Sequence, residues 1–478
     1  MRACRELGIE SVAVYSDADR QALHVRTADR AERIGPAPAK ESYLSVNAVV
    51  EAALRSGADA VHPGYGFLSE NAAFATAVVD AGLIFVGPPP ATLAALGDKL
   101  AARRSVAGAG VPIVPGLMVP LTDEELDLDE VGFPALLKAA AGGGGRGMRR
   151  VESSAEVGPA LAIARQEAMA AFGDATIYAE RLLAPTRHVE VQLLGDRHGG
   201  LAALGERDCS VQRRHQKLVE ESPSPAVTPE IRAALIDSAR RVAATVEFQN
   251  AATVEFLLDA QGNHYFLEMN TRLQVEHGVT ELVTGLDLVT WQIRIAAGER
   301  LPDAYLDAAF SGHAIEVRVY AEDPYDGFRP VAGRVTTWQM PSGPGVRVDA
   351  GIEGTTDLRT EYDPLLAKLL VHAADRPAAI ARLRRALDET LIGGLQTDLG
   401  FYRWLVDEPA FSIGDYDTGL VAERWGSGPT ITPEEMRAAA SAAADARASA
   451  SARGIATRQP TAGESPWARQ ARREATER

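Results

Sequence analysis

Residues 251–281 read AATVEFLLDAQGNHYFLEMNTRLQVEHGVTE, and the rest of the chain is organised around this stretch. Two runs rich in Val, Phe, Leu and Tyr flank residues 259–263, whose composition suits a turn, so we expect a β-hairpin. With the turn centred on Gln261 and Gly262, Glu255 faces Glu268 directly across the two strands. The hairpin is therefore expected to bring two carboxylates together.

The second run is expected to continue past the hairpin as one long polar strand. Side chains alternate along a strand. The face that carries Glu268 would then also carry Asn270, Arg272, Gln274 and Glu276. The opposite face would carry Met269, Leu273 and Val275. One face of this strand is thus entirely polar.

Two carboxylates that face each other repel unless a cation lies between them. Mg²⁺ takes one or two carboxylates and leaves its other positions to water and substrate phosphates. The pattern favours a metal site. An edge strand with a solvated charged face is the alternative that the hairpin by itself leaves open.

The composition is that of an ordinary globular protein. The 478 residues are enough for about three domains, and 46% are hydrophobic while 24% are charged. No apolar run has the length of a membrane span, and Met1 is not followed by an apolar signal core, so we expect a cytoplasmic protein. The net charge of -16 argues against nucleic acid as a partner. The only cysteines, Cys4 and Cys209, indicate neither a disulfide framework nor a zinc site.

Lysine is rare in this chain. Of the 49 basic residues, five are lysines, namely Lys40, Lys99, Lys138, Lys217 and Lys368. A compact ammonium suits a phosphate, so these positions are candidates for ligand contacts, with chance placement as the alternative.

The first 95 residues alternate helices and strands. A short helix closed by Gly8 precedes a strand at 11–16, yet no strand and glycine turn precede that helix, so the pattern indicates a start one element late for a βαβ unit. The alternation predicts a parallel sheet with helices on its faces. Ligands then belong at the carboxyl ends of the strands, where HPGYGFLSEN places Tyr65 and Glu70. Packing of the loop is an equally good explanation for Tyr65.

Residues 133–151 read FPALLKAAAGGGGRGMRRV, which predicts a strand that ends near Lys138, a glycine loop, and a second strand. The backbone N–H groups of such a loop can bind phosphates, and the loop can close as a lid. A flexible hairpin tip is the alternative, because the spacing is neither that of a P-loop nor that of the dinucleotide fingerprint.

Later segments predict a helix at 153–173, an antiparallel set of strands over 176–217, and a helix at 229–246. The antiparallel set has one polar face, for which a solvated sheet face is the alternative to a site. That face carries His188, Glu190, Gln192, Asp208, Gln212, His215 and Lys217. From residue 309 a third, mixed α+β domain is expected, and from Gly426 an Ala/Arg-rich tail that is partly helical or disordered.

Several long motifs resemble the biotin carboxylase family of the ATP-grasp superfamily, between Arg2 and about Trp425. They are RACRELGI, HPGYGFLSENA, GDK, KAAAGGGGRGMR, RHVEVQ, ERDCSVQRRHQK, VEFL, FLEMNTRLQVEH and HAIEVRVYAEDP. The resemblance implies an α/β and α+β fold: an N-terminal parallel-sheet domain (1–95), an ATP-grasp domain (96–308) with a lid at about 116–184, a C-terminal mixed α+β domain (309–425), and the tail (426–478).

The resemblance also implies a reaction. ATP and bicarbonate would give carboxyphosphate, whose CO₂ is transferred to N1′ of biotin on a carrier protein, with Mg²⁺ or Mn²⁺ as the metal. Lys99 and Lys138 match lysines at the ATP phosphates, and Gly143, Gly144, Gly145 and Gly147 the lid. Glu180, Arg181 and Leu183 match positions near the adenine, where the family usually has Lys in place of Arg181. His188, Gln212 and His215 match other nucleotide-site residues.

Further positions match the reaction centre of the family. The resemblance makes Glu255, Glu268 and Asn270 metal ligands, and Lys217 a lysine near bicarbonate and the transferred phosphate. It assigns bicarbonate binding to Arg272, Gln274, Val275 and Glu276, with Glu276 as the general base that a rigid strand places beside Arg272. It assigns Arg318 to stabilisation of the biotin enolate and Tyr65 to a position near biotin.

Two departures from the family stand out. The usual first strand and its loop have no counterpart before Arg2, and Gly278 stands where proline usually follows Glu-His, which would leave that loop freer. No lysine follows Lys368, so the biotin carrier and the carboxyltransferase are expected on separate chains, and a homodimer is implied by the family alone. The alternatives are another bicarbonate-activating ATP-grasp ligase, such as one that resembles carbamoyl-phosphate synthetase, and an inactive binding partner in a carboxylase complex.

Overall fold

The computed structural model describes residues 1–122, 127–140, 148–306, 309–359, 361–426 and 428. The chain divides into two compact units, Met1–Gly426 and Ser427–Arg478, and the architecture below is that of the first. The predicted tail therefore lies almost entirely outside the described residues, as do the lid glycines Gly143, Gly144, Gly145 and Gly147.

The N-terminal part contains parallel strands, as predicted, but in two separate pairs. Strand β1 (Val12–Ser16) pairs with β2 (Arg30–Gly35), and β3 (Ala60–Val61) pairs with β4 (Ile84–Phe85). The predicted parallel arrangement is confirmed, although no strand of the described residues hydrogen-bonds to both pairs. The helices of this part are α1 (Arg2–Glu6), α2 (Leu23–Thr27), α3 (Val46–Ser56) and α4 (Ala72–Asp80), with short turns η1 (Asp17–Asp19) and η2 (Ala39–Glu41).

The next part has a three-stranded antiparallel sheet in the order β6-β5-β7. Its strands are β5 (Ala135–Ala139), β6 (Arg149–Val151) and β7 (Ile177–Arg181), and α7 (Ser154–Phe172) packs on it through Val157, Leu161, Ala164 and Ala168. Helices α5 (Pro90–Gly97) and α6 (Lys99–Gly108) precede this sheet. The expected strand that ends near Lys138 is confirmed, since β5 ends one residue later.

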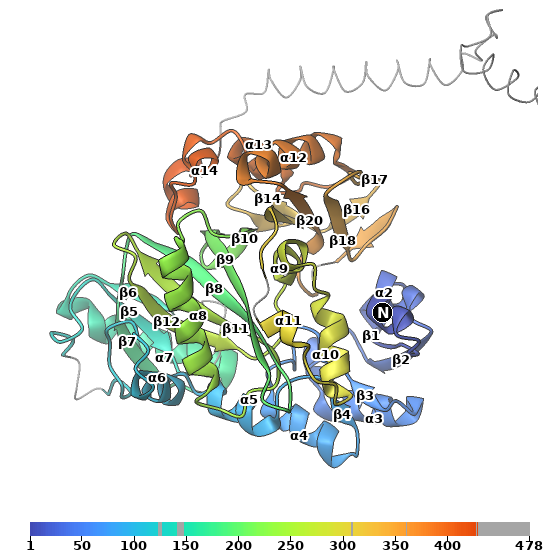
Figure 1. Cartoon of the computed structure of the whole chain (residues 1–478), viewed down its shortest axis with the longest axis horizontal. Helices are drawn as coiled ribbons and strands as arrows, with labels where there is room; N and C mark the ends of the chain where they lie inside the picture. The colour runs from blue at the N-terminus through green and yellow to red at the C-terminus, as the bar shows by residue number, and fades with distance from the viewer. Residues whose placement is uncertain (123–126, 141–147, 307–308, 360, 427, 429–478) are drawn as a thin grey trace, which may run out of the picture. The chain divides into compact units, whose positions relative to one another are not determined.

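A single eight-stranded sheet forms the centre of the first unit, in the order β12-β11-β8-β9-β10-β13-β20-β18 (Figure 1). Every neighbouring pair in it is antiparallel. The strands are β8 (Thr186–Gly195), β9 (Leu201–Arg213), β10 (Gln216–Ser222), β11 (Asn250–Asp259), β12 (His264–Asn270), β13 (His313–Tyr320), β18 (Val346–Ala350) and β20 (Leu365–Ala373). The sheet thus continues from the predicted ATP-grasp region into the predicted C-terminal region through the pairing of β10 with β13.

The hairpin β11–β12 pairs Glu255 with Glu268, as predicted. The turn, however, is centred on Gln261 and not between Gln261 and Gly262 as expected. Near the turn, Leu258 pairs with His264 and Phe256 pairs with Phe266. That register would place Glu255 opposite Leu267, but a bulge between Glu255 and Phe256 shifts the pairing by one residue. The bulge therefore restores the carboxylate pair.

The long polar strand predicted beyond the hairpin is wrong. Strand β12 ends at Asn270, residues 271–276 form an irregular loop, and α9 (His277–Thr284) begins immediately afterwards. The alternation of polar residues had suggested a strand, but Glu276 occupies the N-cap position of α9. Contacts with Glu70, Glu255 and Lys217 therefore determine where the side chains of this loop lie.

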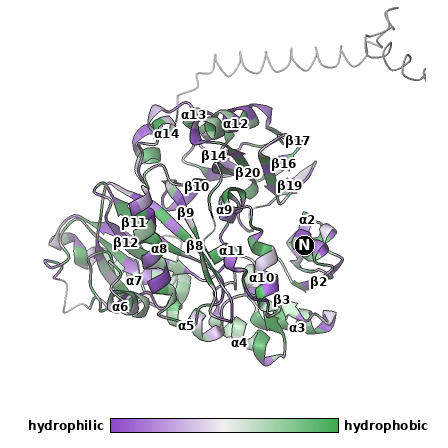
Figure 2. Cartoon of the chain, in the orientation of Figure 1, coloured by the Kyte–Doolittle hydropathy of each residue, from purple (hydrophilic) through white to green (hydrophobic). Residues whose placement is uncertain are grey.

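Helices cover both faces of the sheet (Figure 1). Helix α8 (Pro229–Ala243) packs Leu235, Ala239 and Val242 against inward-facing residues of β8 and β11, whereas α10 (Leu288–Ala296) packs on Ala202, Leu204 and Ala251. Figure 2 shows that the helices carry both hydrophilic and hydrophobic residues, as expected for helices with one buried face.

The C-terminal part adds small antiparallel pairs and helices around β13 and β20. The pairs are β14 (Glu322–Asp323) with β15 (Arg329–Pro330), β16 (Gly333–Val335) with β19 (Thr356–Leu358), and β17 (Thr337–Gln339) with β21 (Leu391–Gly393). The helices of this part are α12 (Arg376–Glu389), α13 (Leu399–Leu405), α14 (Pro409–Ile413) and η3 (Val421–Trp425), whereas the short helix α11 (Asp303–Leu306) contacts β9. The domain boundaries given above stay predictions.

Gly205 lies in a bulge of β9, where the ring of Phe310 packs closely against the strand. Its φ is +77°, and a Cβ there would lie 1.6 Å from Cζ of Phe310. Gly205→Ala is expected to lower the free energy of unfolding by roughly 3 kcal/mol or more, since strain and overpacking add. Urea unfolding measures this loss.

The matched control is Gly199→Ala, because Gly199 has a φ of +90° with nothing within 4 Å of the added Cβ. Only the backbone strain, on the order of 1 kcal/mol, is expected there. Equal losses for the two variants would contradict the close packing of Phe310 on Gly205.

Candidate active site

The polar side chains of the sheet converge on the ammonium of Lys217, in β10. Its Nζ donates to Glu190 Oε2 (2.6 Å), Glu255 Oε1 (3.0 Å) and Glu276 Oε1 (2.6 Å). Burial opposes the charged form of a lysine, but the three carboxylates outweigh it and the pKa of Lys217 lies well above its ordinary value. One cation is thus shared by three carboxylates.

The strand register explains why these carboxylates meet. Glu190 of β8 is the register partner of Glu255 in β11, which is in turn the partner of Glu268 in β12. On the other side, Glu190 pairs with Arg207 of β9. Four adjacent strands therefore present one row of charged side chains.

The alternative of a solvated sheet face is wrong for this row. Glu190 and Gln192 are fully buried, and Glu255 is 4% exposed. Carboxylates buried to this extent must be paired and hydrogen-bonded to remain charged.

Both carboxylate oxygens of Glu255 have hydrogen-bond partners. Besides Lys217, Oε1 accepts from Asn270 Nδ2 (2.9 Å) and Gln274 Nε2 (2.8 Å), and Oε2 lies 2.7 Å from His188 Nε2. Burial raises the pKa of a carboxyl group, but Lys217 and His188 hold the pKa of Glu255 well below its ordinary value. Glu255 is therefore a carboxylate, and the structure brings His188, predicted near the nucleotide, and Gln274, predicted near bicarbonate, into contact with it.

Arg207 is the central residue that the sequence analysis did not single out. This fully buried side chain donates to five groups, with N···O distances from 2.6 to 3.1 Å, on Glu190, Gln192, Thr253, Gln274 and Thr280. It joins β8, β9, β11, the 271–276 loop and α9. The signal in the sequence was its place in ERDCSVQRRHQK, one of the motifs that carry the family resemblance.

Glu276 lies between two cations. Its Oε1 accepts from Lys217, and its Oε2 accepts from Arg318 Nη2 of β13 at 2.9 Å. Although burial raises the pKa of a carboxyl group, Lys217 and Arg318 hold the pKa of Glu276 well below its ordinary value. The arrangement keeps this carboxylate ionised and able to accept a proton from a bound substrate.

Arg272, expected beside Glu276, lies near enough to that carboxylate to interact with it electrostatically but pairs directly with the N-terminal part of the chain. Its Nε donates to Glu70 Oε2 (3.0 Å), whose other oxygen accepts from the backbone N–H of Thr271 (3.0 Å). The expectation assumed a continuous strand, whereas the irregular loop turns Arg272 toward the loop that contains Glu70. Arg272 Nη2 also donates to Asn270 Oδ1 at 3.1 Å.

The other predicted substrate residues lie at the same end of the sheet. The carbonyl of Val275 accepts a hydrogen bond from Lys368 Nζ of β20. Tyr65 is 45% exposed, and Lys368 and Arg318 lie near enough to act electrostatically on its hydroxyl. The structure therefore brings Tyr65, Val275, Glu276 and Arg318 together.

The predicted phosphate lysines also contact carboxylates. Helix α6 begins at Lys99, after Asp98 caps it, and Lys99 Nζ lies 3.0 Å from Glu268 Oε2. Lys138 donates to Glu180 Oε2 at 2.5 Å, and Arg103, which the sequence analysis did not identify, donates to Glu180 Oε1 at 2.5 Å. The predicted adenine-site residue Glu180 is therefore held by two cations.

The remaining predicted nucleotide residues lie around these pairs. Gln212 is buried near the end of β9, and His215 lies in the turn before β10 with an exposed side chain and a φ of +67°. Arg181 has an exposed side chain beside Gly132, and Leu183 is half-buried.

The donor chemistry around Glu255 and Glu268 fits a hard divalent cation. Two carboxylates face each other across the hairpin, with the amide of Asn270 next to Glu255. Lys217 and Lys99 supply the positive charge that these carboxylates need. Oxygen ligands of this kind suit Mg²⁺ or Mn²⁺. His188, Glu190 and Glu255 form a second close group of metal-type ligands, but the Lys217 ammonium contacts two of the three.

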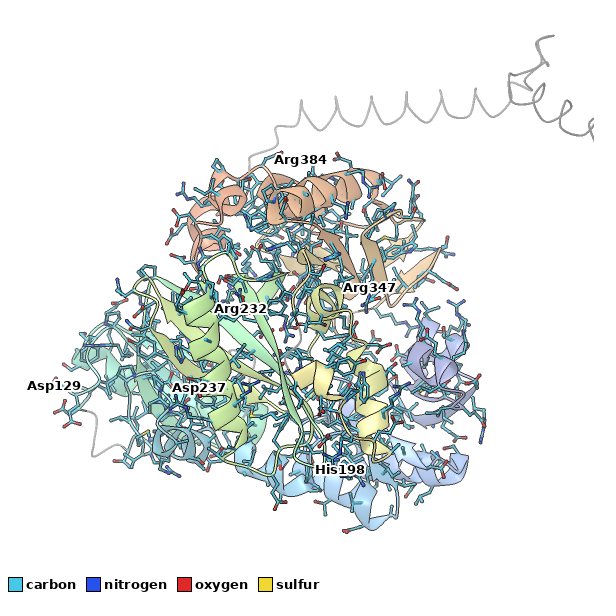
Figure 3. All side chains as sticks on the ribbon, in the orientation of Figure 1. Asp129, His198, Arg232, Asp237, Arg347 and Arg384 are labelled. Atoms are coloured by element: carbon cyan, nitrogen blue, oxygen red, sulfur yellow. The ribbon has the colours of Figure 1, made fainter. Side chains whose placement is uncertain are left out.

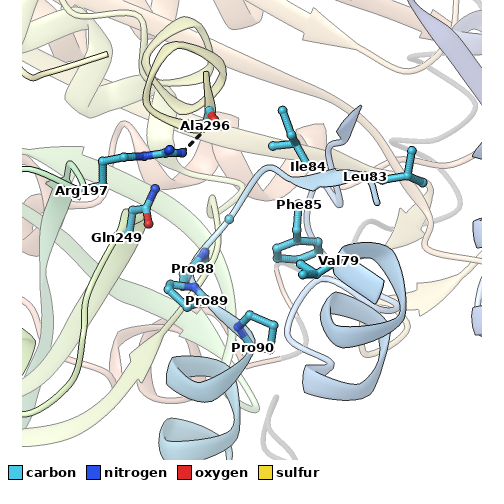
Figure 4. Close-up of a pocket in the computed structure, with 11 residues that line it drawn as sticks. Val79, Leu83, Ile84, Phe85, Pro88, Pro89, Pro90, Arg197, Gln249 and Ala296 are labelled. Atoms are coloured by element: carbon cyan, nitrogen blue, oxygen red, sulfur yellow. Dashed lines mark hydrogen bonds between the residues drawn. The ribbon is translucent and has the colours of Figure 1, made fainter. Parts of the chain in front are cut away.

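A pocket of about 270 Å³ lies elsewhere in the first unit (Figure 4). It is lined mainly by apolar residues of 79–90, together with Arg197 and Gln249. None of its lining residues belongs to the charged row, so it is not the candidate site. No helix of the described residues is long and apolar enough to cross a membrane.

Comparison with known families matches nearly the whole first unit. Residues 1–93 match a family described as "Biotin carboxylase, N-terminal domain", residues 98–304 the "Carbamoyl-phosphate synthase L chain, ATP binding domain", and residues 316–423 the "Biotin carboxylase C-terminal domain".

Two curated relatives share almost half of the aligned residues. The chain is 48% identical over 426 residues to the mitochondrial methylcrotonoyl-CoA carboxylase subunit alpha of Oryza sativa subsp. japonica, across 88% of this chain but 58% of that protein. It is 47% identical over 426 residues to the biotin carboxylase of Nostoc sp., across 88% of this chain and 95% of that protein.

Solved structures agree with these relatives. The biotin carboxylase domain of Hydrogenobacter thermophilus 2-oxoglutarate carboxylase, a dimer in complex with MgADP, ADP and bicarbonate, has a TM-score of 0.87 at 42% identity, covering 90% of this chain and 96% of that one. The biotin carboxylase of Campylobacter jejuni has a TM-score of 0.86 at 42% identity, covering 88% and 95%. The predicted ATP-grasp fold is therefore confirmed.

A variant of Arg207 tests how much the stability of the protein depends on this one buried cation. Arg207→Lys keeps the charge but cannot reach five acceptors, so Glu190, Gln274 and the two threonines lose donors. We expect the free energy of unfolding to fall by about 3–5 kcal/mol, measured by urea unfolding.

Arg232→Lys is the matched control. Arg232, in the first turn of α8 (Figure 3), makes a two-point pair with Glu206 of β9 through Nε and Nη2, but its side chain is 24% exposed. A loss of about 1 kcal/mol or less is expected there. If both variants lost the same stability, the central role of Arg207 would be wrong.

Proposed function

The chain belongs to the biotin carboxylase family, and on that premise we propose that it is an ATP-dependent ligase that carboxylates biotin with bicarbonate, by way of carboxyphosphate. The observation that carries the proposal is the ionised Glu276, held between Lys217 and Arg318 at the end of the charged row. Such a carboxylate is placed to act as a general base in a site that the other predicted substrate residues also line.

Glu276 would take the proton of bicarbonate. The freed bicarbonate oxygen then attacks the γ-phosphorus of ATP, ADP leaves with the electron pair of the broken P–O bond, and carboxyphosphate results. Lys217 Nζ contacts Glu276 directly, so its charge can stabilise negative oxygens that form next to this carboxylate. Carboxyphosphate then breaks into CO₂ and phosphate, the phosphate takes the proton of the biotin nitrogen, and that nitrogen forms the new N–C bond to CO₂.

Arg272, Gln274 and Val275 would bind bicarbonate beside Glu276. The partner that Arg272 has in this structure, Glu70, would then share the guanidinium with the anion. Arg318 would stabilise the negative ureido oxygen of biotin, and the exposed ring of Tyr65 would pack against the biotin.

Lys99, Lys138 and the glycines Gly143, Gly144, Gly145 and Gly147 would bind the ATP phosphates. Since Lys138 contacts Glu180 in this structure, it would divide its donors between that carboxylate and a phosphate. Glu180, Arg181, Leu183, His188, Gln212 and His215 would surround the rest of the nucleotide. A Mg²⁺ or Mn²⁺ ion held by Glu255, Glu268 and Asn270 would neutralise the charge of the phosphates.

The partners follow from the same premise. Biotin would arrive on a carrier protein, and the carboxyl group would leave with a carboxyltransferase, both supplied by other chains or by segments outside this one. A homodimer is also proposed, because the Hydrogenobacter domain is described as a dimer. A cytoplasmic location stays a prediction, since some relatives are named as mitochondrial.

Glu276→Gln removes the proposed base while preserving the shape of the side chain. Biotin-dependent ATP hydrolysis is expected to fall about 10²- to 10⁴-fold, because an amide cannot accept the proton of bicarbonate. The rate is measured with free biotin, and nucleotide binding is measured in parallel by calorimetry. Full turnover in this variant would show that another group is the base.

The choice of acceptor separates biotin carboxylation from the carbamoyl-phosphate type of reaction, whose ATP-binding domain also matches residues 98–304. Bicarbonate-dependent ATP hydrolysis should rise with biotin and not with ammonia. Stimulation by ammonia alone would favour the second reaction, and nucleotide binding without either activity would favour an inactive binding partner.

A variant of Glu268 tests whether this residue is a ligand of the proposed metal ion. Glu268→Gln leaves Glu255 without a second carboxylate across the hairpin, so the Mg²⁺ concentration for half-maximal activity should rise by roughly 10-fold or more. Direct Mn²⁺ binding in the presence of nucleotide should weaken in parallel. Asp259→Asn is the control, since Asp259 accepts the hydrogen bonds of the turn of the same hairpin. An unchanged metal requirement in Glu268→Gln would remove it from the ligands.

A further inference from the structure

Behind Arg318, two buried carboxyl groups face each other across the sheet. Glu220 of β10 and Glu316 of β13 are register partners, and both are fully buried. Helix α9 packs against this face of β13. Like charges directly opposite each other on neighbouring strands are destabilising, and burial adds to the cost. The pair therefore requires compensation.

Hydrogen bonds from the described residues do not supply that compensation. Both oxygens of Glu316, and Oε2 of Glu220, accept no hydrogen bond from any residue that the structure describes. The nearest cation to Glu316 is Lys368 of β20, with its Nζ 3.4 Å from Oε2, and that ammonium also donates to the carbonyl of Val275. A full charge on Glu316 would thus be poorly solvated.

Arg318 is shared between this pair and the proposed base. Its Nη2 lies 2.5 Å from Glu220 Oε1 and 2.9 Å from Glu276 Oε2, while Nε donates to Glu220 at 2.7 Å. One guanidinium thus bridges a carboxylate of the pair and the carboxylate that would act on bicarbonate.

The charged groups around Glu316 come from four elements. They are Glu220 on β10, Arg318 on β13, Lys368 on β20 and Glu276 at the start of α9, with Asp349 of β18 lying 3.8 Å from Lys368. Three carboxyl groups in this set, Glu220, Glu276 and Glu316, therefore meet two cations. Burial, opposed by Lys368 and reinforced by Glu220, raises the pKa of Glu316 to about 8, and burial raises the pKa of Glu220 as well.

We propose that Glu220 and Glu316 hold one proton between them and act as a positioning pair, which keeps the Arg318 guanidinium on Glu276. The proposal deepens the function above and rests on it only for the role of Glu276. With the proton in place, Glu316 is neutral and does not compete for Arg318 or Lys368. Neither carboxyl of the pair needs to touch a substrate.

Loss of this proton changes the balance of contacts. A second negative charge would then repel Glu220 and attract both Arg318 and Lys368. Arg318 would be drawn from Glu276, and Lys368 from the carbonyl of Val275. The pair thus links proton loss to the geometry of two residues of the proposed bicarbonate site.

The first test is the pH dependence of stability. A carboxyl group whose pKa is raised on folding binds a proton in the folded chain that the unfolded chain has already released, so stability falls as pH rises from the ordinary value of 4.5 to about 8. Glu316→Gln has no proton to lose. Its midpoint of thermal unfolding, relative to wild type, should therefore rise steadily between pH 5 and pH 8.

The second test is the pH profile of biotin-dependent ATP hydrolysis, with each protein compared with its own maximum. Wild type should lose kcat as pH passes about 8, whereas Glu316→Gln should keep its kcat to higher pH. Glu322→Gln is the matched control. Glu322 is also buried, with one unpartnered oxygen among the described residues and a pKa raised by burial to about 7, but it contacts neither Arg318 nor Glu276 in the structure. Its variant should follow the wild-type activity profile.

Infrared difference spectroscopy detects the shared proton without any assay of activity. The carbonyl band of a protonated carboxyl group should be present in wild type at pH 7 and weaker in Glu316→Gln. It should also weaken in Glu220→Gln, because Glu316 then ionises beside Lys368. A band as intense in both variants as in wild type, or a relative unfolding midpoint of Glu316→Gln that is flat with pH, would overturn the proposal. An inactive wild type with these two results intact would refute the proposed function alone.

Discussion

The centre of this protein depends on the ion pairs between the ammonium of Lys217 and three buried carboxylates. Glu190, Glu255 and Glu276 come from two strands and a helix N-terminus, and all three are buried within reach of this one cation. Burying three carboxylates side by side is unfavourable unless a cation and hydrogen-bond donors compensate. Lys217, Arg207 and His188 supply them, and so the charged row can lie inside the sheet rather than on its surface.

This compensation determines the chemical state of each residue. Glu255 and Glu276 remain ionised because their cations outweigh burial, whereas Glu316 accepts no hydrogen bond from the described residues, and burial outweighs the nearby Lys368 and raises its pKa to about 8. Ionised and protonated carboxyl groups thus lie near one another, on β11, at the start of α9 and on β13. The proposed base Glu276 and the neutral Glu316 lie near each other. Arg318 contacts both Glu276 and Glu220, the register partner of Glu316.

The close packing of α9 also accounts for Gly278. A Cβ at this position would lie 2.5 Å from Cδ2 of Leu370 and 3.3 Å from Glu316 Oε2. The glycine thus lies in a buried first turn of a helix, next to the carboxyl pair, rather than in a free loop. Its absence of a side chain lets α9 approach β20 where the positioning pair is enclosed.

Local patterns in the sequence determined much of this protein. Periodicity located the hairpin and most helices, and the motifs identified the family and residues that meet at Lys217. Tertiary structure decided the rest. A bulge corrected the Glu255–Glu268 register, and the 271–276 loop turned Arg272 toward Glu70. Arg207, Arg103 and the Glu220–Glu316 pair gained importance only through burial. Alternation along a strand shows which residues share a face, but burial and contacts between distant strands decide which of them must be charged, paired or protonated.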